Sequence, residues 1–160
     1  MNGAPDHPRP RFESDRDRKS EDFFRRVLED LWHVRLTRTP DLTSWDFNII
    51  VPFSNVLGGY VEFKMRGCRA GTYTHYFVFQ NKIDRAIYIA EQNLIPFILV
   101  VKFTDIMLAI ELTRARIRHY PLERNGRVTN PRDSFDVQYA YHIPVSDFVH
   151  PMEIRIKGVL

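Results

Sequence analysis

The clearest alternation of apolar and polar positions lies near the middle of the chain, between residues 45 and 66. The segment WDFNIIV is rich in aromatic and β-branched residues, which favours a β-strand, and Pro52 ends it. A second strand, YVEFKMR, follows four turn-forming residues that include Gly58 and Gly59. The pattern therefore predicts a hairpin with Gly58-Gly59 in its turn, and the rest of the chain is organised around it.

Apolar positions elsewhere recur at helical or strand spacing. Ser20 is a suitable N-cap for a first helix, and Ile83, Ala86, Ile87 and Ala90 mark the buried stripe of a second. The elements that we expect outside the hairpin are a helix over 20–33, a short strand over 34–39, a helix over 80–93, a buried strand over 96–103, and strands over 106–112 and 137–145. This order predicts an α/β domain in which helices flank a mixed β-sheet.

Length, composition and charge limit the number of domains and the class of protein. The chain has 160 residues and a net charge of +3, which suits one mildly basic globular domain. Residues 1–19 are charged, contain three prolines and lack apolar periodicity, so we expect a disordered arm before a single domain over 20–160. The absence of a membrane-length apolar run and of a signal-peptide core predicts a cytoplasmic protein of a bacterium or archaeon, or of the host if viral.

Chemistry enters at the hairpin. Glu62 and Lys64 are two positions apart on the second strand, so they share one face of it. An antiparallel return brings Asp46, near the start of the first strand, beside Glu62. Two carboxylates and one amine would then converge within a sheet, which is costly unless a cation lies between the acids. The alternative is a solvent-facing salt-bridge cluster on an exposed sheet face.

This order of elements and motif resembles the PD-(D/E)XK nuclease superfamily, which has the restriction-endonuclease-like fold. The motif is Asp46, Glu62 and Lys64, with fifteen residues between the two acids, and the resemblance covers roughly residues 20–112. It implies an αβββαβ core, here with extra C-terminal strands. Trp45 stands where the family motif has Pro.

The resemblance also implies roles for these residues. The two acids, Asp46 and Glu62, would bind Mg²⁺ or Mn²⁺, and Lys64 would position the attacking water and stabilise the phosphorane. The family often has an acid in its first helix, which Glu21 matches, and a Gln or Lys in its second. Gln80 is the residue that we assign to that catalytic position, with Lys82 as its alternative and otherwise a nucleic-acid contact.

Basic residues indicate where nucleic acid would lie. Arg66 and Arg69 directly follow the Glu-x-Lys strand. The set Arg114, Arg116 and Arg118 occupies alternate positions, so in an extended segment these side chains would project from one face and contact phosphates. A solvated basic edge strand is the competing interpretation of this set. Further arginines in the following loops are Arg124, Arg127 and Arg132.

Other kinds of site find little support. The six histidines show no HxH or HExxH spacing, which argues against a zinc hydrolase. The only cysteine, Cys68, excludes an intramolecular disulfide. Gly58-Gly59 lacks the following helix of a phosphate-binding loop, and we expect no small-molecule cofactor. We assign the aromatic residues of TYTHYFVF to core packing.

The sequence thus predicts a Mg-dependent deoxyribonuclease, an endonuclease similar to compact resolvase-like and phage-encoded members of the superfamily. We expect structure-selective or weakly sequence-selective cutting of DNA. A homodimer would supply two centres for cutting two strands, although the sequence shows no interface. Two alternatives remain open: a non-catalytic nucleic-acid-binding or assembly protein that retains the fold, and a sequence-specific restriction enzyme.

Overall fold

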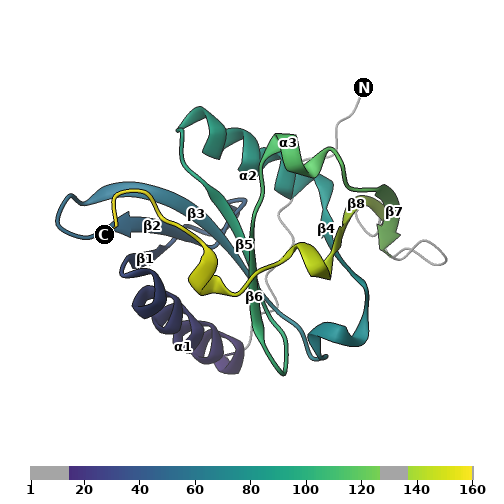
Figure 1. The fold of residues 1–160 in the computed structure, drawn as a ribbon, viewed down its shortest axis with the longest axis horizontal. Helices are drawn as coiled ribbons and strands as arrows, with labels where there is room; N and C mark the ends of the chain where they lie inside the picture. The colour runs from purple at the N-terminus through teal and green to yellow at the C-terminus, as the bar shows by residue number, and fades with distance from the viewer. Residues whose placement is uncertain (1–14, 127–136, 160) are drawn as a thin grey trace.

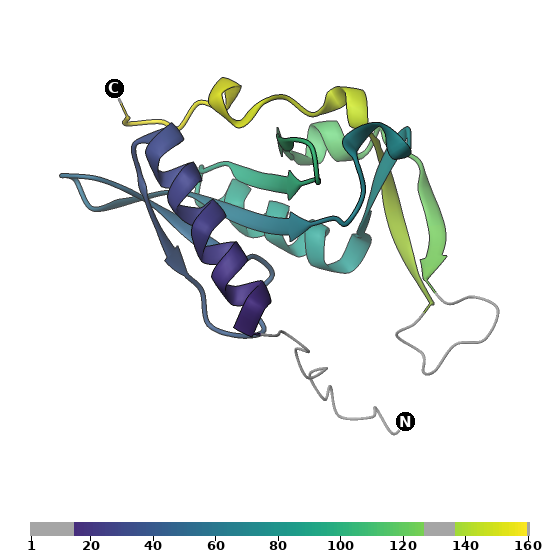
Figure 2. The same ribbon diagram turned by 90° about the horizontal axis from the view of Figure 1, so that it is seen from below.

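The computed structural model describes residues 15–126 and 137–159 (Figure 1). In chain order the elements are α1 (Asp15–Trp32), β1 (Arg35–Arg38), β2 (Phe47–Val51), β3 (Val56–Met65), η1 (Ala70–Thr72), β4 (His75–Phe79), α2 (Gln80–Gln92), β5 (Phe97–Lys102), β6 (Met107–Glu111), α3 (Arg114–Ile117), β7 (Leu122–Gly126), β8 (Val137–Pro144), η2 (Val145–Asp147) and η3 (Pro151–Glu153). Helices α1 and α2 lie on opposite faces of a central sheet (Figures 1 and 2).

Within the described residues, the central sheet has five strands in the order β1-β2-β3-β5-β6. Its pairs are antiparallel except for β3 and β5, which are parallel. A parallel pair needs a long crossover connection, and here β4 and α2 supply it. Strands β4, β8 and β7 form a separate antiparallel sheet beside the central one.

Apolar residues pack on both faces of the central sheet. On the α1 face, Leu28 and Trp32 belong to a buried cluster with Val61 of β3. On the α2 face, the cluster contains the predicted stripe of Ile83, Ala86, Ile87 and Ala90. Strand β5 is buried on both sides as predicted, because it lies between the two helices and between two other strands.

The sequence therefore predicts most elements correctly, and the fold class is α/β with a restriction-endonuclease-like mixed sheet. The expected first helix begins too late. Helix α1 starts at Asp15, five residues before the predicted Ser20 N-cap. Residues 15–19 of the expected disordered arm are thus helical, while residues 1–14 lie outside the described ranges. No helix of the described chain is long and apolar enough to cross a membrane.

The Gly58-Gly59 pair is not a turn. Both glycines are buried inside β3, which begins at Val56. A Cβ on Gly59 would lie 3.1 Å from the Pro96 carbonyl oxygen, and one on Gly58 would lie 2.9 Å from Val51 Cγ2. Glycine is therefore required here for the close approach of neighbouring segments, at the place where the register of β2 and β3 shifts.

The basic segment after β6 is helical rather than extended. Residues Arg114–Ile117 form the short helix α3, whose N-cap Thr113 accepts a hydrogen bond from the Arg116 backbone N–H, and Ile117 is buried. Side chains two positions apart on a helix point about 200° apart. The expectation that Arg114, Arg116 and Arg118 project from one face of an extended segment was wrong, and so was the competing interpretation of a solvated basic edge strand.

The C-terminal segment ties the outer edge of the sheet to α1. Ala109 of β6 and Val149 exchange two backbone hydrogen bonds of 2.8 Å each. The Trp32 indole of α1 donates a 2.8 Å hydrogen bond to the Pro151 carbonyl at the start of η3. The segment thus covers part of the β6 edge and fixes α1 against the sheet.

Candidate active site

Strand β3 carries both residues of the Glu-x-Lys motif at the centre of the molecule. Glu62 is buried, with only 1% of its surface exposed. Two ammonium groups reach the same carboxylate oxygen, because Lys64 Nζ lies 2.5 Å from Glu62 Oε1 and Lys82 Nζ of helix α2 lies 2.6 Å from it. The predicted pairing of Glu62 with Lys64 on one face is confirmed, and that face is the one covered by α2.

Asp46 is held beside these residues by the backbone of β3. It is 7% exposed and directly precedes β2. Its backbone N–H donates to the Val61 carbonyl at 2.9 Å, and its Oδ2 accepts a 2.9 Å hydrogen bond from the Phe63 backbone N–H. Thr39 further fixes the segment, since its hydroxyl donates to the Trp45 carbonyl at 2.5 Å. The two acids are therefore brought together on adjacent chain segments.

Burial and charge shift the proton affinities of this cluster. Burial raises the pKa of Glu62, and the nearby Asp46 charge adds to the rise, whereas the Lys64 and Lys82 ammonium groups oppose it. Burial acts to lower the pKa of Lys64, but the charges of Glu62 and Asp46 outweigh it, so the pKa of Lys64 is raised. Lys64 is therefore a cation at neutral pH.

One oxygen of the cluster is unsatisfied within the described residues. Glu62 Oε2 is buried and has no hydrogen-bond partner there. A buried acceptor without a donor is costly, and a carboxylate oxygen beside a second carboxylate is the type of ligand that Mg²⁺ and Mn²⁺ prefer. The residues fit such a cation. Because the described residues contain no group of three or more His, Cys, Asp or Glu placed to hold a metal ion, the cation would bind these two carboxylates and water.

The alternative of a solvent-facing salt-bridge cluster holds only in part: Glu62 has salt bridges to Lys64 and Lys82, but both acids are buried. The structure also distinguishes Gln80 from Lys82, the two residues of helix α2 proposed for the catalytic position. Lys82, predicted as a nucleic-acid contact, is the residue that reaches Glu62. Gln80 lies instead at the Tyr141 hydroxyl, which itself donates a 2.7 Å hydrogen bond to Asp84.

Glu21 lies on α1, on the other side of the central sheet. Its carboxylate accepts a 2.8 Å hydrogen bond from the Arg38 guanidinium of β1. Arg38 also lies over the Phe47 ring, with 5.2 Å between the guanidinium carbon and the ring centroid. The structure thus gives Glu21 an ion-pair partner, and its role in catalysis remains a prediction.

Comparison with known families gives the same assignment as the fold and the cluster. Residues 7–150 match the family described as "Phage putative PDDEXK endonuclease". The chain belongs to this family. Among solved structures it is similar to Hjc, a Holliday junction resolvase of Archaeoglobus fulgidus, with a TM-score of 0.49 and 13% identity over 81% of this chain and 96% of that chain. A search of curated proteins found no match.

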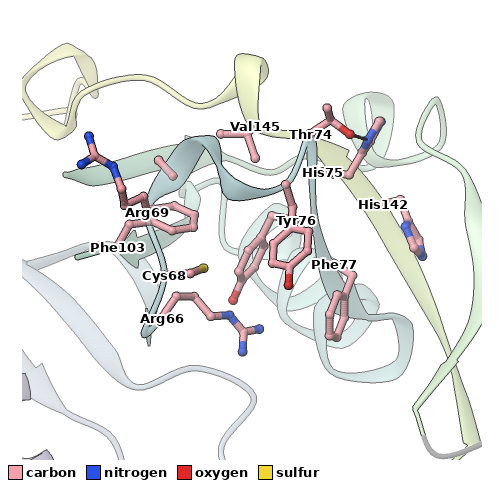
Figure 3. Close-up of a pocket in the computed structure, with 12 residues that line it drawn as sticks. Arg66, Cys68, Arg69, Thr74, His75, Tyr76, Phe77, Phe103, His142 and Val145 are labelled. Carbon is pink, nitrogen blue, oxygen red and sulfur yellow. Dashed lines mark hydrogen bonds between the residues drawn. The ribbon is translucent and has the colours of Figure 1, made fainter. Parts of the chain in front are cut away.

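In this PD-(D/E)XK family member, Arg66 and Arg69 lie where β3 ends and border a cavity of about 430 Å³ (Figure 3). The Arg66 guanidinium carbon is 4.9 Å from the centroid of the Tyr76 ring. Arg69 is exposed and has an ion pair of 3.7 Å with Asp105. The arginines predicted to follow the motif strand are thus close to it in space.

Among the residues that the structure describes, the remaining predicted arginines do not line this cavity. Arg116 donates a 2.9 Å hydrogen bond to the Glu111 carbonyl, and Arg114 Nε lies 4.0 Å from Glu91. Arg118 and Arg124 are exposed. Arg127 and Arg132 lie outside the described residues.

Sequence reasoning missed the cavity because it assigned the aromatic residues of TYTHYFVF to the core. The assignment holds for Tyr76, which is buried. It fails for Tyr73, Phe77 and Phe79, which are exposed. Strand β4 alternates exposed and buried positions, and this period of two in HYFVF was the signal available in the sequence.

Proposed function

We propose that this chain is a metal-dependent DNA endonuclease whose centre is formed by Asp46, Glu62, Lys64 and Lys82. The observation that carries the proposal is the buried Glu62 carboxylate, whose second oxygen finds no partner among the described residues while Asp46 lies beside it. Membership in the PD-(D/E)XK endonuclease family supports it, because nucleases of this class typically use a divalent metal.

Asp46 and Glu62 are the residues that would bind Mg²⁺ or Mn²⁺. Such an ion supplies charge neutralisation at the phosphate and lowers the pKa of bound water. Asp46 is suited to this role because the Phe63 backbone N–H already fixes its carboxylate. Glu62 is suited because its Oε2 is available and its Oε1 is held by two ammonium groups.

Lys64 and Lys82 act by charge. The charges of Glu62 and Asp46 outweigh burial and raise the pKa of Lys64, which favours its ammonium form. This ammonium group would stabilise the negative charge that develops on the phosphorane and orient the attacking water through a donated hydrogen bond. Lys82 supplies a second positive charge from α2, and it replaces Gln80 as the candidate of that helix.

We expect structure-selective or weakly sequence-selective cutting. The site lies on a domain whose described surface combines Arg66 and Arg69 with exposed aromatic side chains, which suits recognition of backbone and unstacked bases. A homodimer would allow two strands to be cut, and this remains part of the proposal.

A cleavage assay tests the proposal. Wild type, Lys64→Ala and Glu62→Gln are incubated with supercoiled plasmid, linear duplex and a four-way junction, in Mg²⁺, Mn²⁺ or EDTA. We expect metal-dependent cutting by wild type only, with losses on the order of 10²-fold or more in both variants. Glu62→Gln should still bind DNA, because it removes charge and keeps the volume of the side chain.

Several outcomes would contradict the proposal. If Glu62→Gln cuts at the wild-type rate, the centre is elsewhere. If the folded wild type neither binds a divalent metal nor cuts any substrate, the chain is a nucleic-acid-binding or assembly protein with the nuclease fold. Cutting confined to one short sequence would instead identify a restriction enzyme.

A further inference from the structure

We propose that the cavity beside the candidate centre binds one unpaired nucleotide of the DNA substrate. We call it the basic-aromatic cavity, and its lining includes Arg66, Arg69, His75, Tyr76, Phe77 and His142. The inference rests on the proposed function for its substrate class, but it makes a separate claim about binding. It assigns a ligand to a site other than the acidic cluster.

The cavity is close to the candidate centre through β3 and β4. Arg66 follows Lys64 by two positions, and its backbone N–H donates a 2.8 Å hydrogen bond to the Lys102 carbonyl at the end of β5. Tyr76 of β4 lies near enough to Lys64 and Glu62 for their charges to act on its pKa, which burial raises. A nucleotide in the cavity would therefore be close to a phosphate at the candidate centre.

Aromatic rings and one guanidinium form a surface suited to stacking. The Tyr76 and Phe77 rings are 6.4 Å apart and nearly parallel, at 17°. The Arg66 guanidinium carbon lies 4.9 Å from the Tyr76 centroid and 5.6 Å from the Phe77 centroid. Phe77 is 38% exposed and Tyr73, also at the cavity, is 69% exposed. Such large exposed aromatic surfaces in a concave site indicate a ligand with a flat apolar face.

Polar groups around the rings match the rest of a nucleotide. Arg66 and Arg69 can bind phosphate oxygens, and Thr74 and His75 add a hydroxyl and an imidazole that are 2.9 Å apart (Figure 3). His142 Nε2, on β8, has no hydrogen-bond partner in the described part of the chain, although a Glu123 carboxylate oxygen lies 3.6 Å away. A base edge could satisfy this nitrogen.

The cavity selects for an unpaired base over a paired one. Its volume of about 430 Å³ is in the range of about 300–1,000 Å³ that holds small organic ligands, and this excludes a duplex. The faces of a paired base are covered by its neighbours in the stack, so a base must leave the stack to enter. The cavity thus favours bulges, overhangs and branch points, or a base flipped out of duplex.

A binding assay without metal tests the inference independently of cleavage. The full chain in EDTA is titrated with two DNA duplexes that contain 2-aminopurine, one as a single-base bulge and one in a base pair. We expect binding of the bulge to be about tenfold tighter than that of the paired duplex, with a change in 2-aminopurine fluorescence on stacking. A fluorescence change with the paired probe as well would show that the protein flips the base.

Substitutions in the cavity test whether the preference for the bulge and the fluorescence change arise from binding there. Phe77→Ala and Tyr73→Ala should each reduce the preference for the bulge severalfold and diminish the fluorescence change, while Phe77→Trp should retain them. The matched control is Tyr88→Ala, an exposed aromatic of α2 outside the cavity, which should behave as wild type. Equal affinity of wild type for both duplexes, or an unchanged preference in Phe77→Ala, would overturn the inference.

The two proposals fail separately. A chain that shows the Phe77-dependent preference but never cuts DNA has the nucleotide cavity and lacks the proposed activity. A chain that cuts with metal but binds both duplexes equally has the activity and lacks the cavity function.

Discussion

Asp46 combines a structural and a chemical contribution in one side chain. One carboxylate oxygen accepts the Phe63 backbone N–H, and the charge of the group acts on Glu62. The hydrogen bond needs only an oxygen, whereas metal binding needs the negative charge. Different substitutions can therefore separate the two contributions.

Asp46→Asn keeps an acceptor oxygen and removes the charge. We expect the free energy of unfolding to stay within about 1 kcal/mol of wild type, and cleavage to fall on the order of 10²-fold or more. Asp46→Ala leaves the buried Phe63 N–H unpaired and should cost about 1–3 kcal/mol of stability. Urea unfolding and the plasmid assay measure both effects. Asp30→Asn, on the exposed part of α1, is the control, and an Asp46→Asn variant that cuts at the wild-type rate would contradict the assignment.

The site was predictable where it depends on strand alternation. Glu62 and Lys64 share a face of the strand because they are two positions apart. The position of Asp46 beside Glu62 was expected because the two strands of the hairpin run antiparallel. Lys82 was not predictable in the same way. Side chains two apart on a helix point in different directions, so the start and tilt of α2 decide whether Gln80 or Lys82 reaches the sheet. The start and the tilt of α2 depend on packing between elements that are far apart in the sequence.

At the scale of elements, close contacts determine how the strands and helices fit together. Gly59 lies in β3 against the Pro96 segment that leads into β5, and Tyr141 joins β8 to α2 through Asp84. Each contact can be tested by substituting one residue outside the candidate centre.

Gly59→Ala should destabilise the fold. The new Cβ would meet the Pro96 carbonyl oxygen at 3.1 Å and Ile49 Cδ1 at 3.0 Å, so either the strand or its neighbours must move. We expect a loss of about 1–3 kcal/mol in the free energy of unfolding, measured by urea denaturation. Gly71→Ala is the control, because a Cβ there meets nothing within 4 Å. Equal stability of both variants would show that β3 has room for a side chain.

Tyr141→Phe should alter the alkaline limit of stability. Burial and the hydrogen bond to Asp84 raise the pKa of Tyr141 to about 12 from the ordinary value of 10.0. The folded state therefore holds the phenolic proton more tightly than the unfolded chain. The protonated hydroxyl stabilises the folded state fully below pH 10.0, and this stabilisation is lost as pH rises through about 12. The variant should be about 1 kcal/mol less stable at pH 8 and should show a shallower loss above pH 10.

Thermal unfolding from pH 8 to 12 measures this difference. Tyr139→Phe on the same strand is the control, because Tyr139 is exposed and its hydroxyl is not part of the contact between β8 and α2. If both variants follow the wild-type curve, the Asp84 contact does not stabilise the docking of β8 on α2.

Element prediction succeeded where periodicity is strong and local. The stripe of α2 and the continuous apolar run of β5 were sufficient to place both. Element prediction failed where a contact between residues distant in the sequence determines the local structure. Gly58-Gly59 has the composition of a turn, yet the proximity of Pro96 makes glycine necessary in a strand. The Arg114–Ile117 segment alternates like a strand, yet the Thr113 cap and burial of Ile117 favour a helical turn.

At the scale of the whole molecule, positive charge is distributed unevenly around the candidate centre. Arg66 and Arg69 border the basic-aromatic cavity beside the candidate centre, whereas Arg114 and Arg116 lie on the separate helix α3. Arginines available to phosphates release counterions when DNA binds, and this release sets the salt dependence of the affinity.

Replacing Arg66 and Arg69 with Gln should therefore reduce the slope of log K against log salt concentration by about 2. The corresponding Arg114→Gln and Arg116→Gln double variant should reduce it by about 1 or less, because α3 points these side chains in different directions. Fluorescence anisotropy on a fixed duplex at several salt concentrations gives both slopes. A larger effect of the α3 pair would place the main DNA contact at α3 instead of at the cavity.

The C-terminal segment has a consequence for assembly. Val149 occupies the backbone groups of Ala109 on β6, the strand at one edge of the central sheet. Exposed strand edges are the usual sites of strand addition between chains. A second copy could extend the sheet at this point only by displacing Val149, and the opposite edge, β1, carries Arg35 and Arg38 on its ends. Extension of the central sheet by a second copy is therefore disfavoured at both of its edges, β1 and β6.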